Sequence, residues 1–156
     1  MKYFLDTEFI EDGKTIDLLS IGIVSDEGKI FYAESSEADK SKASDWVKKN
    51  VLPHITGPGQ TRAEIRDGIL KYIGAEKPEF WAYYADYDWV ALCQLFGTMM
   101  DLPKGWPMYC RDIKQLCDSL GNPKLPEQKI LEHNALADAG HGREMYRFLL
   151  RHGAKK

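Results

Sequence analysis

Asp6 and Glu8 have the residue types and the spacing of a cation site. They are two residues apart and follow a short apolar run, Tyr3–Leu5. Alternate side chains of a β-strand point to the same face, so both carboxylates are expected on one side of a strand. Two negative charges this close repel each other unless a cation lies between them. The pair therefore predicts a metal site, although most isolated Asp-x-Glu pairs are one exposed residue and one turn residue.

A second acidic signal is Asp88, which lies in an aromatic stretch, Tyr83–Trp89. A charge in apolar surroundings needs a partner or a metal ion. Asp88 also precedes the apolar run Val90–Leu95, so it could instead cap a helix at that point. Asp86 is close enough to compete for the metal-binding role. The residues alone leave these alternatives open.

The third signal is the segment that contains His133 and Asp138. A helix is predicted from about Asn134 to Leu150, which puts Asp138 in its first turns and His133 just before it. Imidazole titrates near neutral pH and is the most common general base in enzymes. His133 is therefore a candidate base beside a candidate metal ligand, while the alternative is an ordinary solvated histidine in a loop.

These three signals together match what phosphodiester hydrolysis requires. That reaction often uses two hard cations about 4 Å apart, which hold the attacking water and the leaving oxygen. Mg²⁺ prefers carboxylate ligands and retains several waters, and a base must take the proton of the attacking water. The chain offers one set of residues for each requirement, at predicted strand ends and helix starts.

The elements that would position these residues alternate between strands and helices. Strands are predicted over Tyr3–Leu5, Ile16–Val24, Lys29–Ala33, Phe80–Tyr84 and Met108–Cys110. Helices are predicted from Ser44 to Val51, from a capping box formed by Thr61 and Glu64, after Asp88, from Asp112 to Leu120, and from about Asn134 to Leu150. The order β-β-β-α-α-β-α-β-α-α predicts an α/β fold, a mixed sheet covered by helices.

Length and composition predict one domain, residues 1–156. The 156 residues are 44% hydrophobic, which is enough for a core, and no apolar run approaches the roughly 18 residues that span a membrane. The N-terminus lacks the pattern of a signal peptide, so a cytoplasmic protein without membrane contact is expected. The three cysteines have no metal-binding spacing and are predicted to be buried free thiols.

The net charge of −3 disfavours broad, non-specific binding to duplex nucleic acid. Leaving out four carboxylates as metal ligands (Asp6, Glu8, Asp88 and Asp138) changes the net charge to +1. Bound cations would also reverse the local field around those residues. The charge is therefore compatible with a small pocket centred on metal ions.

Three segments carry a resemblance to a known family. FLDTEF, YADYDWVAL and HNALADA resemble the three motifs of the DEDDh, or DnaQ-like, 3′–5′ exonucleases of the ribonuclease H-like superfamily. The resemblance extends from Asp6 to about Leu150, and the first and third motifs match closely. The second motif departs from the family's frequent His-Asn-x-x-Phe-Asp. Aligning its final aromatic-Asp pair selects Asp88 over Asp86.

The resemblance implies a ribonuclease H-like fold with a mixed five-stranded sheet and a metal-dependent hydrolase. It implies that two Mg²⁺ ions, with Mn²⁺ able to substitute, bind to Asp6, Glu8, Asp88 and Asp138. His133 would be the general base, and nucleoside 5′-monophosphates would be released from a 3′ end. The segment DTEFIEDGKTIDLLSIG is most similar to compact bacterial exoribonucleases.

Single-stranded RNA is therefore the expected substrate, and a homodimer is expected by analogy with relatives of this size. A DNA proofreading or repair exonuclease is the alternative within the enzyme class. A ribonuclease H-like module that binds nucleic acid without cleaving it is the alternative outside that class.

Several residues near the motifs are candidates for contact with the terminal nucleotide. Aromatic rings can stack on a base, and the candidates are Phe9, Trp46, Tyr83, Tyr84, Trp89 and Trp106. Phe9 and Trp89 are favoured among them because they adjoin candidate catalytic residues, although core packing is the more common role for any one of these rings. Thr7 lies between two candidate ligands, and its backbone is a further candidate contact.

Overall fold

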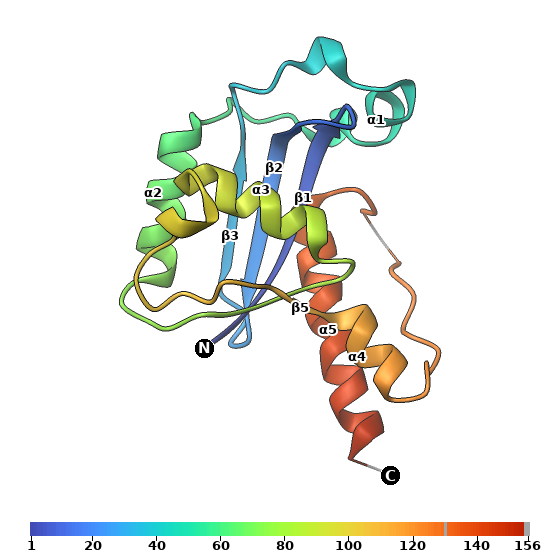
Figure 1. The fold of residues 1–156 in the computed structure, drawn as a ribbon. Helices are drawn as coiled ribbons and strands as arrows, with labels where there is room; N and C mark the ends of the chain where they lie inside the picture. The colour runs from blue at the N-terminus through green and yellow to red at the C-terminus, as the bar shows by residue number, and fades with distance from the viewer. Residues whose placement is uncertain (130, 155–156) are drawn as a thin grey trace.

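The central strand of the molecule is the one that carries Asp6 and Glu8. A computed structural model describes residues 1–129 and 131–154 and contains a five-stranded sheet in the order β3-β2-β1-β4-β5 (Figure 1). The strands are β1 (Lys2–Glu11), β2 (Ile16–Ser25), β3 (Ile30–Glu34), β4 (Glu79–Ala82) and β5 (Arg111–Asp112). The first three form an antiparallel meander, while β4 runs parallel to β1 and β5 runs parallel to β4. The predicted mixed five-stranded sheet is confirmed.

Within the described residues, five α-helices connect or cover the strands. They are α1 (Asp45–Asn50), α2 (Arg62–Ile73), α3 (Asp86–Phe96), α4 (Ile113–Ser119) and α5 (Ala135–Gly153). Short 3₁₀ turns lie at η1 (Lys40–Lys42), η2 (Leu52–His54) and η3 (Met99–Asp101). The order of strands and α-helices is the predicted one, and it is consistent with a ribonuclease H-like α/β fold.

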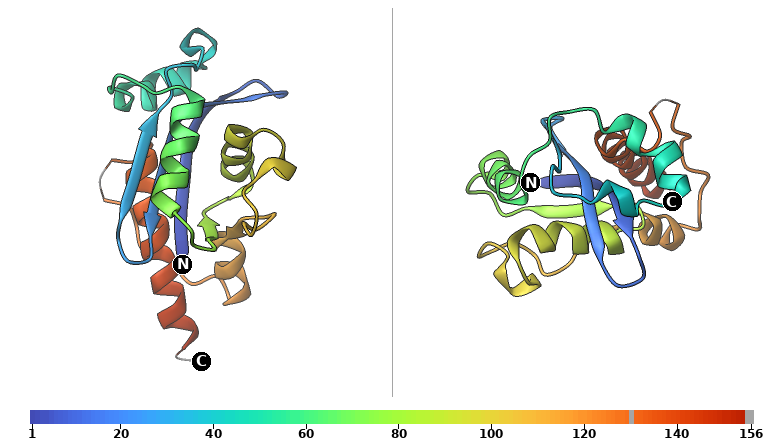
Figure 2. Two further views of the ribbon diagram at one scale, coloured as in Figure 1. Left: turned by 90° about the vertical axis from the view of Figure 1, so that its left-hand side faces the viewer. Right: turned by 90° about the horizontal axis from the view of Figure 1, so that it is seen from above.

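The two faces of the sheet are covered by different helices, and Figure 2 shows α3 and α5 on opposite sides. On one face, side chains of α2 and α3 pack with Tyr3 and Leu5 in the larger core cluster. On the other face, Phe4 packs with Tyr146 and Leu149 of α5 and with residues of α4. Residues 3, 4 and 5 are thus buried on alternating faces, as expected for a central strand.

Local signals fixed most helix starts correctly. Thr61 and Glu64 form the predicted capping box at the start of α2, and the Ser44 side chain accepts the N–H of Val47 at the start of α1. Asn134 caps α5 by accepting the N–H of Ala137. These side chains satisfy backbone donors that lack partners inside the helix, which is why the sequence alone reveals them.

Two strand predictions were wrong in their extent. β1 does not end before Asp6 but continues to Glu11, because β2 pairs with it along its whole length. The strand predicted at Met108–Cys110 is instead the two-residue β5, where Arg111 and Asp112 pair with Trp81 and Ala82. In both cases the neighbouring strand decides the boundary, and a propensity pattern does not contain that information.

Two further expectations are answered by the described part of the chain. None of its helices has the length and apolar character needed to cross a bilayer. All three thiols are free; Cys93 and Cys117 are buried, while Cys110 is partly exposed.

Candidate active site

β1 delivers Asp6 and Glu8 to the face of the sheet that α5 covers. Phe4, on that face, packs on Tyr146 of α5 with ring centroids 5.2 Å apart. Two residues on, Asp6 lines a cavity of about 370 Å³ together with Asp138 and other residues of α5. A β-bulge follows Glu8, where the pairing register with β2 shifts. Bulges end regular pairing and redirect side chains, and this one lies directly after the second carboxylate.

A glycine allows the start of α5 to lie against the sheet beside Asp6. Gly22 of β2 pairs with Asp6, and a Cβ atom at this position would be only 2.3 Å from the carbonyl oxygen of Ala135. No other residue type fits without moving the helix. Because Asp138 is three residues beyond Ala135, this close approach brings its carboxylate to the pair on β1.

His133 and Asp138 are held together by a backbone hydrogen bond. The N–H of His133 donates to Oδ2 of Asp138 at 3.0 Å, and Gln128 Nε2 donates to Oδ1 at 2.5 Å. His133 has a φ of 64°, in the left-handed region that few non-glycine residues adopt. One possible ligand atom from each of Glu8, His133 and Asp138 lies within 4.8 Å of the others. The third motif therefore meets the first at a distance that one cation could bridge.

Asp88 reaches the site from the opposite face of β1. It is 6% exposed, and its Oδ1 accepts both the N–H of Thr7 at 2.9 Å and the hydroxyl of Thr7 at 2.6 Å. Both bonds use the same oxygen, which leaves Oδ2 as the atom available to a ligand. Asp86 is exposed in the first turn of α3. Of the two residues that the sequence left open, the structure puts Asp88 against β1.

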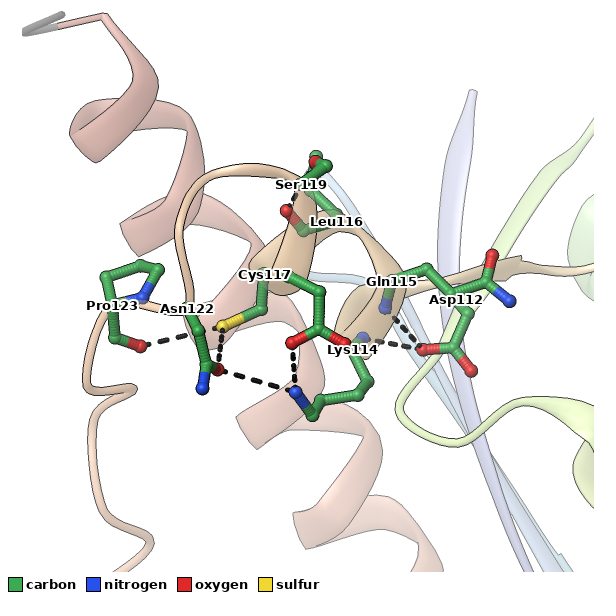
Figure 3. A network of polar contacts seen from close by, with 9 residues as sticks. Asp112, Lys114, Gln115, Leu116, Cys117, Ser119, Asn122 and Pro123 are labelled. Carbon is green, nitrogen blue, oxygen red and sulfur yellow. Dashed lines mark hydrogen bonds and ion pairs between the residues drawn. The ribbon is translucent and has the colours of Figure 1, made fainter.

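The helix-cap alternative for Asp88 was wrong. α3 begins at Asp86, its N-cap is Ala85, and Asp88 is a first-turn residue. The N–H of Ala85 is instead bound by the carboxylate of Asp112, 2.9 Å away. The other Asp112 oxygen caps α4 by accepting the N–H groups of Lys114 and Gln115 (Figure 3). Asp112 thus links the start of α4 to the start of the helix that carries Asp88.

The pKa values of all four carboxyl groups are raised above their ordinary values. Burial is the largest cause for each of them, and the neighbouring carboxylates add to it for Asp6, Glu8 and Asp88. The pKa of Asp6 is raised well above its usual range, that of Glu8 to about 8 and that of Asp88 to about 6. Burial also raises the pKa of Asp138, against the effect of its hydrogen bonds. Such mutual repulsion is relieved when cations bind.

The three residues predicted to contact substrate lie in different surroundings. Thr7 is buried, and its N–H and hydroxyl are occupied by Asp88. Phe9 stacks on Tyr87 of α3, with centroids 5.6 Å apart and an interplanar angle of 13°. Trp89 packs against Phe80 on the edge of the main core. Phe9 and Trp89 are both partly exposed, whereas Thr7 is buried, and the substrate roles of all three stay predictions.

Comparison with known proteins agrees with this geometry. The sequence profile described as "3′–5′ exoribonuclease Rv2179c-like domain" matches residues 1–150. The chain belongs to this exoribonuclease family. The 3′–5′ exoribonucleases Rv2179c and MT2234.1, from Mycobacterium tuberculosis strains H37Rv and CDC 1551, are each 43% identical to it over 146 residues. Each alignment covers 89% of this chain and 87% of the relative. The prediction of a 3′–5′ exoribonuclease, a hydrolase, is confirmed at the level of the family.

Some contacts of the predicted residues in this exoribonuclease domain carried no recognisable signal. Gln128 binds Asp138, and Asp112 binds the N-cap of α3. Trp46 was a candidate for stacking on a base, and its ring packs against that of His133, a contact that the sequence did not indicate. A glycine inside a β-rich run was the one available hint for the close approach at Gly22. The other contacts join segments far apart in the sequence, so no local spacing announces them.

Proposed function

We propose that residues 1–156 act as one metal-dependent 3′–5′ exoribonuclease domain that shortens single-stranded RNA. The observation that carries the proposal is the convergence of four carboxyl groups with raised pKa values and one imidazole, in a chain of this family. Both relatives are named as 3′–5′ exoribonucleases, which supports RNA over DNA as the substrate.

The carboxylates fit divalent cations with oxygen ligands. Asp6, Glu8, Asp88 and Asp138 would hold two Mg²⁺ ions, with Mn²⁺ as a substitute. Bound there, the ions would supply Lewis-acid stabilisation of the charge that develops on the phosphate and on the leaving oxygen. A site with unpaired buried carboxylates costs stability without cations, so the donor set itself supports this assignment.

His133 is proposed as the general base. Its imidazole takes a proton from the attacking water as the new P–O bond forms and the bond to the 3′ oxygen of the preceding nucleotide breaks. The leaving oxygen gains a proton from solvent, giving a nucleoside 5′-monophosphate and an RNA one residue shorter. Asp138 orients the base through the N–H of His133, and Thr7 orients Asp88.

Phe9 is proposed to stack on the terminal base. Phe9 follows Glu8 in the sequence, and its ring stacks on that of Tyr87 in α3. Base stacking on an aromatic ring is worth about 1–3 kcal/mol and accepts any base, which suits an enzyme that removes nucleotides in turn. A homodimer is also proposed, by analogy, and light scattering of the purified protein tests it.

The test compares RNA and DNA oligomers of one sequence, labelled at the 5′ end, with Mg²⁺. We expect stepwise shortening of RNA from its 3′ end and release of 5′-monophosphates. His133→Ala should lower the rate by roughly 10²–10⁴-fold and leave Mg²⁺ affinity, measured by calorimetry, nearly unchanged.

Three outcomes would contradict parts of this proposal. Faster hydrolysis of DNA would reverse the substrate preference. Intact RNA and DNA after hours with Mg²⁺ or Mn²⁺ would indicate a module that only binds. Loss of Mg²⁺ binding in the His133 variant would make the imidazole a ligand rather than a base.

A further inference from the structure

The ring of His133 has an aromatic neighbour from a distant part of the chain. Trp46 of α1 contacts it edge to face, with ring centroids 4.8 Å apart and an interplanar angle of 79°. The two residues are 87 positions apart in the sequence. Nothing in the three motifs or in their spacing involves α1.

Trp46 does not contribute to the core in the way its size would suggest. It is 54% exposed, although large aromatic side chains are mostly buried when they serve packing. α1 is attached to the sheet by other residues: Val51 is buried with Ile10 and Leu19, and Val47 packs against the same cluster. The contact with His133 is therefore separate from the contacts that hold α1 in place.

The segment that carries Trp46 is fixed to the sheet at several points. Ser35 and Gln60 form an isolated β-bridge where this segment leaves and rejoins the sheet. Buried Glu34 accepts the N–H of Gly57 at 2.6 Å. These bonds attach both ends of the segment that contains α1 to the sheet, which restricts its movement.

Among the described residues, His133 has few fixing bonds. Its backbone is in the left-handed region, and the bond that holds it there within this part of the chain runs from its N–H to Asp138. That bond sets the place of the Cα atom but leaves rotation about the side-chain bonds unconstrained. The Trp46 ring blocks one side of the imidazole and so limits the range of its rotamers.

We propose that Trp46 is a positioning residue, which holds the His133 imidazole toward Glu8 and Asp138. The inference rests on the proposed role of His133 as general base. A general base must lie within hydrogen-bonding distance of the proton that it removes, and a ring that turns freely spends less time there. α1 would thereby belong to the catalytic apparatus although it carries none of the motif residues.

A double-mutant cycle in single-turnover RNA hydrolysis at saturating Mg²⁺ tests the proposal. With His133 present, Trp46→Ala should lower the rate about tenfold, which is the upper range for an aromatic pair. In the His133→Ala background the same substitution should have no further effect, because its route of action is gone. Trp46→Phe, which retains an aromatic edge, should keep most of the rate. The apparent KM for RNA and the affinity for a nucleoside 5′-monophosphate should stay unchanged.

Tyr109→Ala is the matched control, since this ring is exposed to the same extent, 55%, and contacts Arg111 instead. It should leave rate and KM unchanged. An equal tenfold loss in both His133 backgrounds, or a raised KM, would overturn the proposal and indicate that Trp46 contacts RNA. No loss in the His133-containing background would overturn it as well. Failure of the base assignment is distinguishable, because His133→Ala alone would then retain the wild-type rate.

A measurement without activity gives an independent check. The protein has four histidines, and the Hε1 resonance of His133 should carry a ring-current shift from Trp46. In Trp46→Ala and, to a smaller extent, in Trp46→Phe, that resonance should move while those of His54, His141 and His152 stay in place. An unmoved His133 signal would overturn the proposal, and movement of all four would indicate a general disturbance of the fold.

Discussion

The two halves of β1 use the same backbone for opposite purposes. From Tyr3 to Leu5 the strand is buried on both faces and packs apolar side chains against helices above and below. From Asp6 to Glu8 it carries two carboxylates toward α5, and the residue between them binds a third carboxylate on the other face. The side chains of the first half need no partner beyond the apolar residues that they pack against. The second half concentrates like charges, which costs stability and creates the capacity to bind cations.

Because the two halves are consecutive parts of one strand, the packed half holds the carboxylates of the other half in place. Paired strands and tightly packed helices hold the first half, and the second half continues the same strand without a hinge. Repelling groups on a loop would move apart, whereas groups on a central strand cannot. Functional sites built on rigid elements keep their geometry at the expense of local stability.

Adjacent substitutions on the two halves should separate activity from stability most strongly. Asp6→Ala should lower RNA hydrolysis by more than about 10³-fold and weaken Mg²⁺ binding, because it removes a proposed metal ligand. Leu5→Ala should lower the free energy of unfolding by about 2–5 kcal/mol, because it leaves a cavity in the main core.

Single-turnover kinetics and urea denaturation of both variants measure the contrast. Metal-free Asp6→Ala should be as stable as the wild type or more so, since a repelling charge is gone. If metal-free Asp6→Ala had the same free energy of unfolding as Leu5→Ala, the carboxylates of the site would not destabilise the folded state through their repulsion.

Between about pH 4 and pH 8, the dependence of stability on pH should come mainly from carboxyl groups of the site, above all Glu8 on β1 and Asp88 on α3. The pKa of Glu8 is about 8 in the folded chain against an ordinary 4.5, and that of Asp88 is about 6 against 3.8. The folded state therefore binds more protons than the unfolded state between about pH 4 and pH 8. Stability from these groups is fully present below that window and is lost as the pH rises through it.

Thermal unfolding at several pH values, with and without Mg²⁺, measures this effect. In EDTA the Tm should be more than about 4 °C lower at pH 8 than at pH 5, since each kcal/mol changes Tm by about 2–4 °C in a chain of this size. Mg²⁺ should stabilise the protein more at pH 8 than at pH 5, and Glu8→Gln should flatten both trends. A metal-free protein that is more stable at pH 8 than at pH 5 would contradict the assignment.

The sequence alone predicts those features of the molecule that depend on residues close together in the chain. Thr61 with Glu64, Ser44 and Asn134 cap their helices within three residues, so these starts were readable directly. The alternation of Asp6 and Glu8 is equally local. Alignment with the second family motif selected Asp88 over Asp86, but the hydrogen bond that holds Asp88 against β1 joins it to Thr7, 81 positions away, and has no local signal.

The same reasoning explains what the sequence could not provide. β5 has only two residues and exists because β4 pairs with it, so its own residues carry no sufficient pattern. The Trp46–His133 contact requires knowledge of where α1 packs. Motifs identify which residues act, whereas the contacts that orient them come from tertiary structure.

Gly22 of β2 pairs with Asp6, where the second half of β1 begins. Its substitution should have a smaller effect than Asp6→Ala or the change in pH. A methyl group there would meet the Ala135 carbonyl at 2.3 Å, so Gly22→Ala must push the start of α5 away from Asp6. Overpacking of this kind typically costs about 1–3 kcal/mol. It should also weaken Mg²⁺ binding, because Asp138 moves with the helix.

Gly140→Ala is the control. Gly140 lies in α5, the helix that Gly22→Ala would displace, and a Cβ atom at Gly140 meets nothing within 4 Å. It should raise the free energy of unfolding by about 0.4–1 kcal/mol, because alanine restricts the unfolded chain more than glycine does. Mg²⁺ titration and urea denaturation of both variants measure the difference. If Gly22→Ala lowers stability while Mg²⁺ affinity stays at the wild-type value, Asp138 does not depend on the close approach of α5, and the two halves of β1 are less tightly coupled than their geometry indicates.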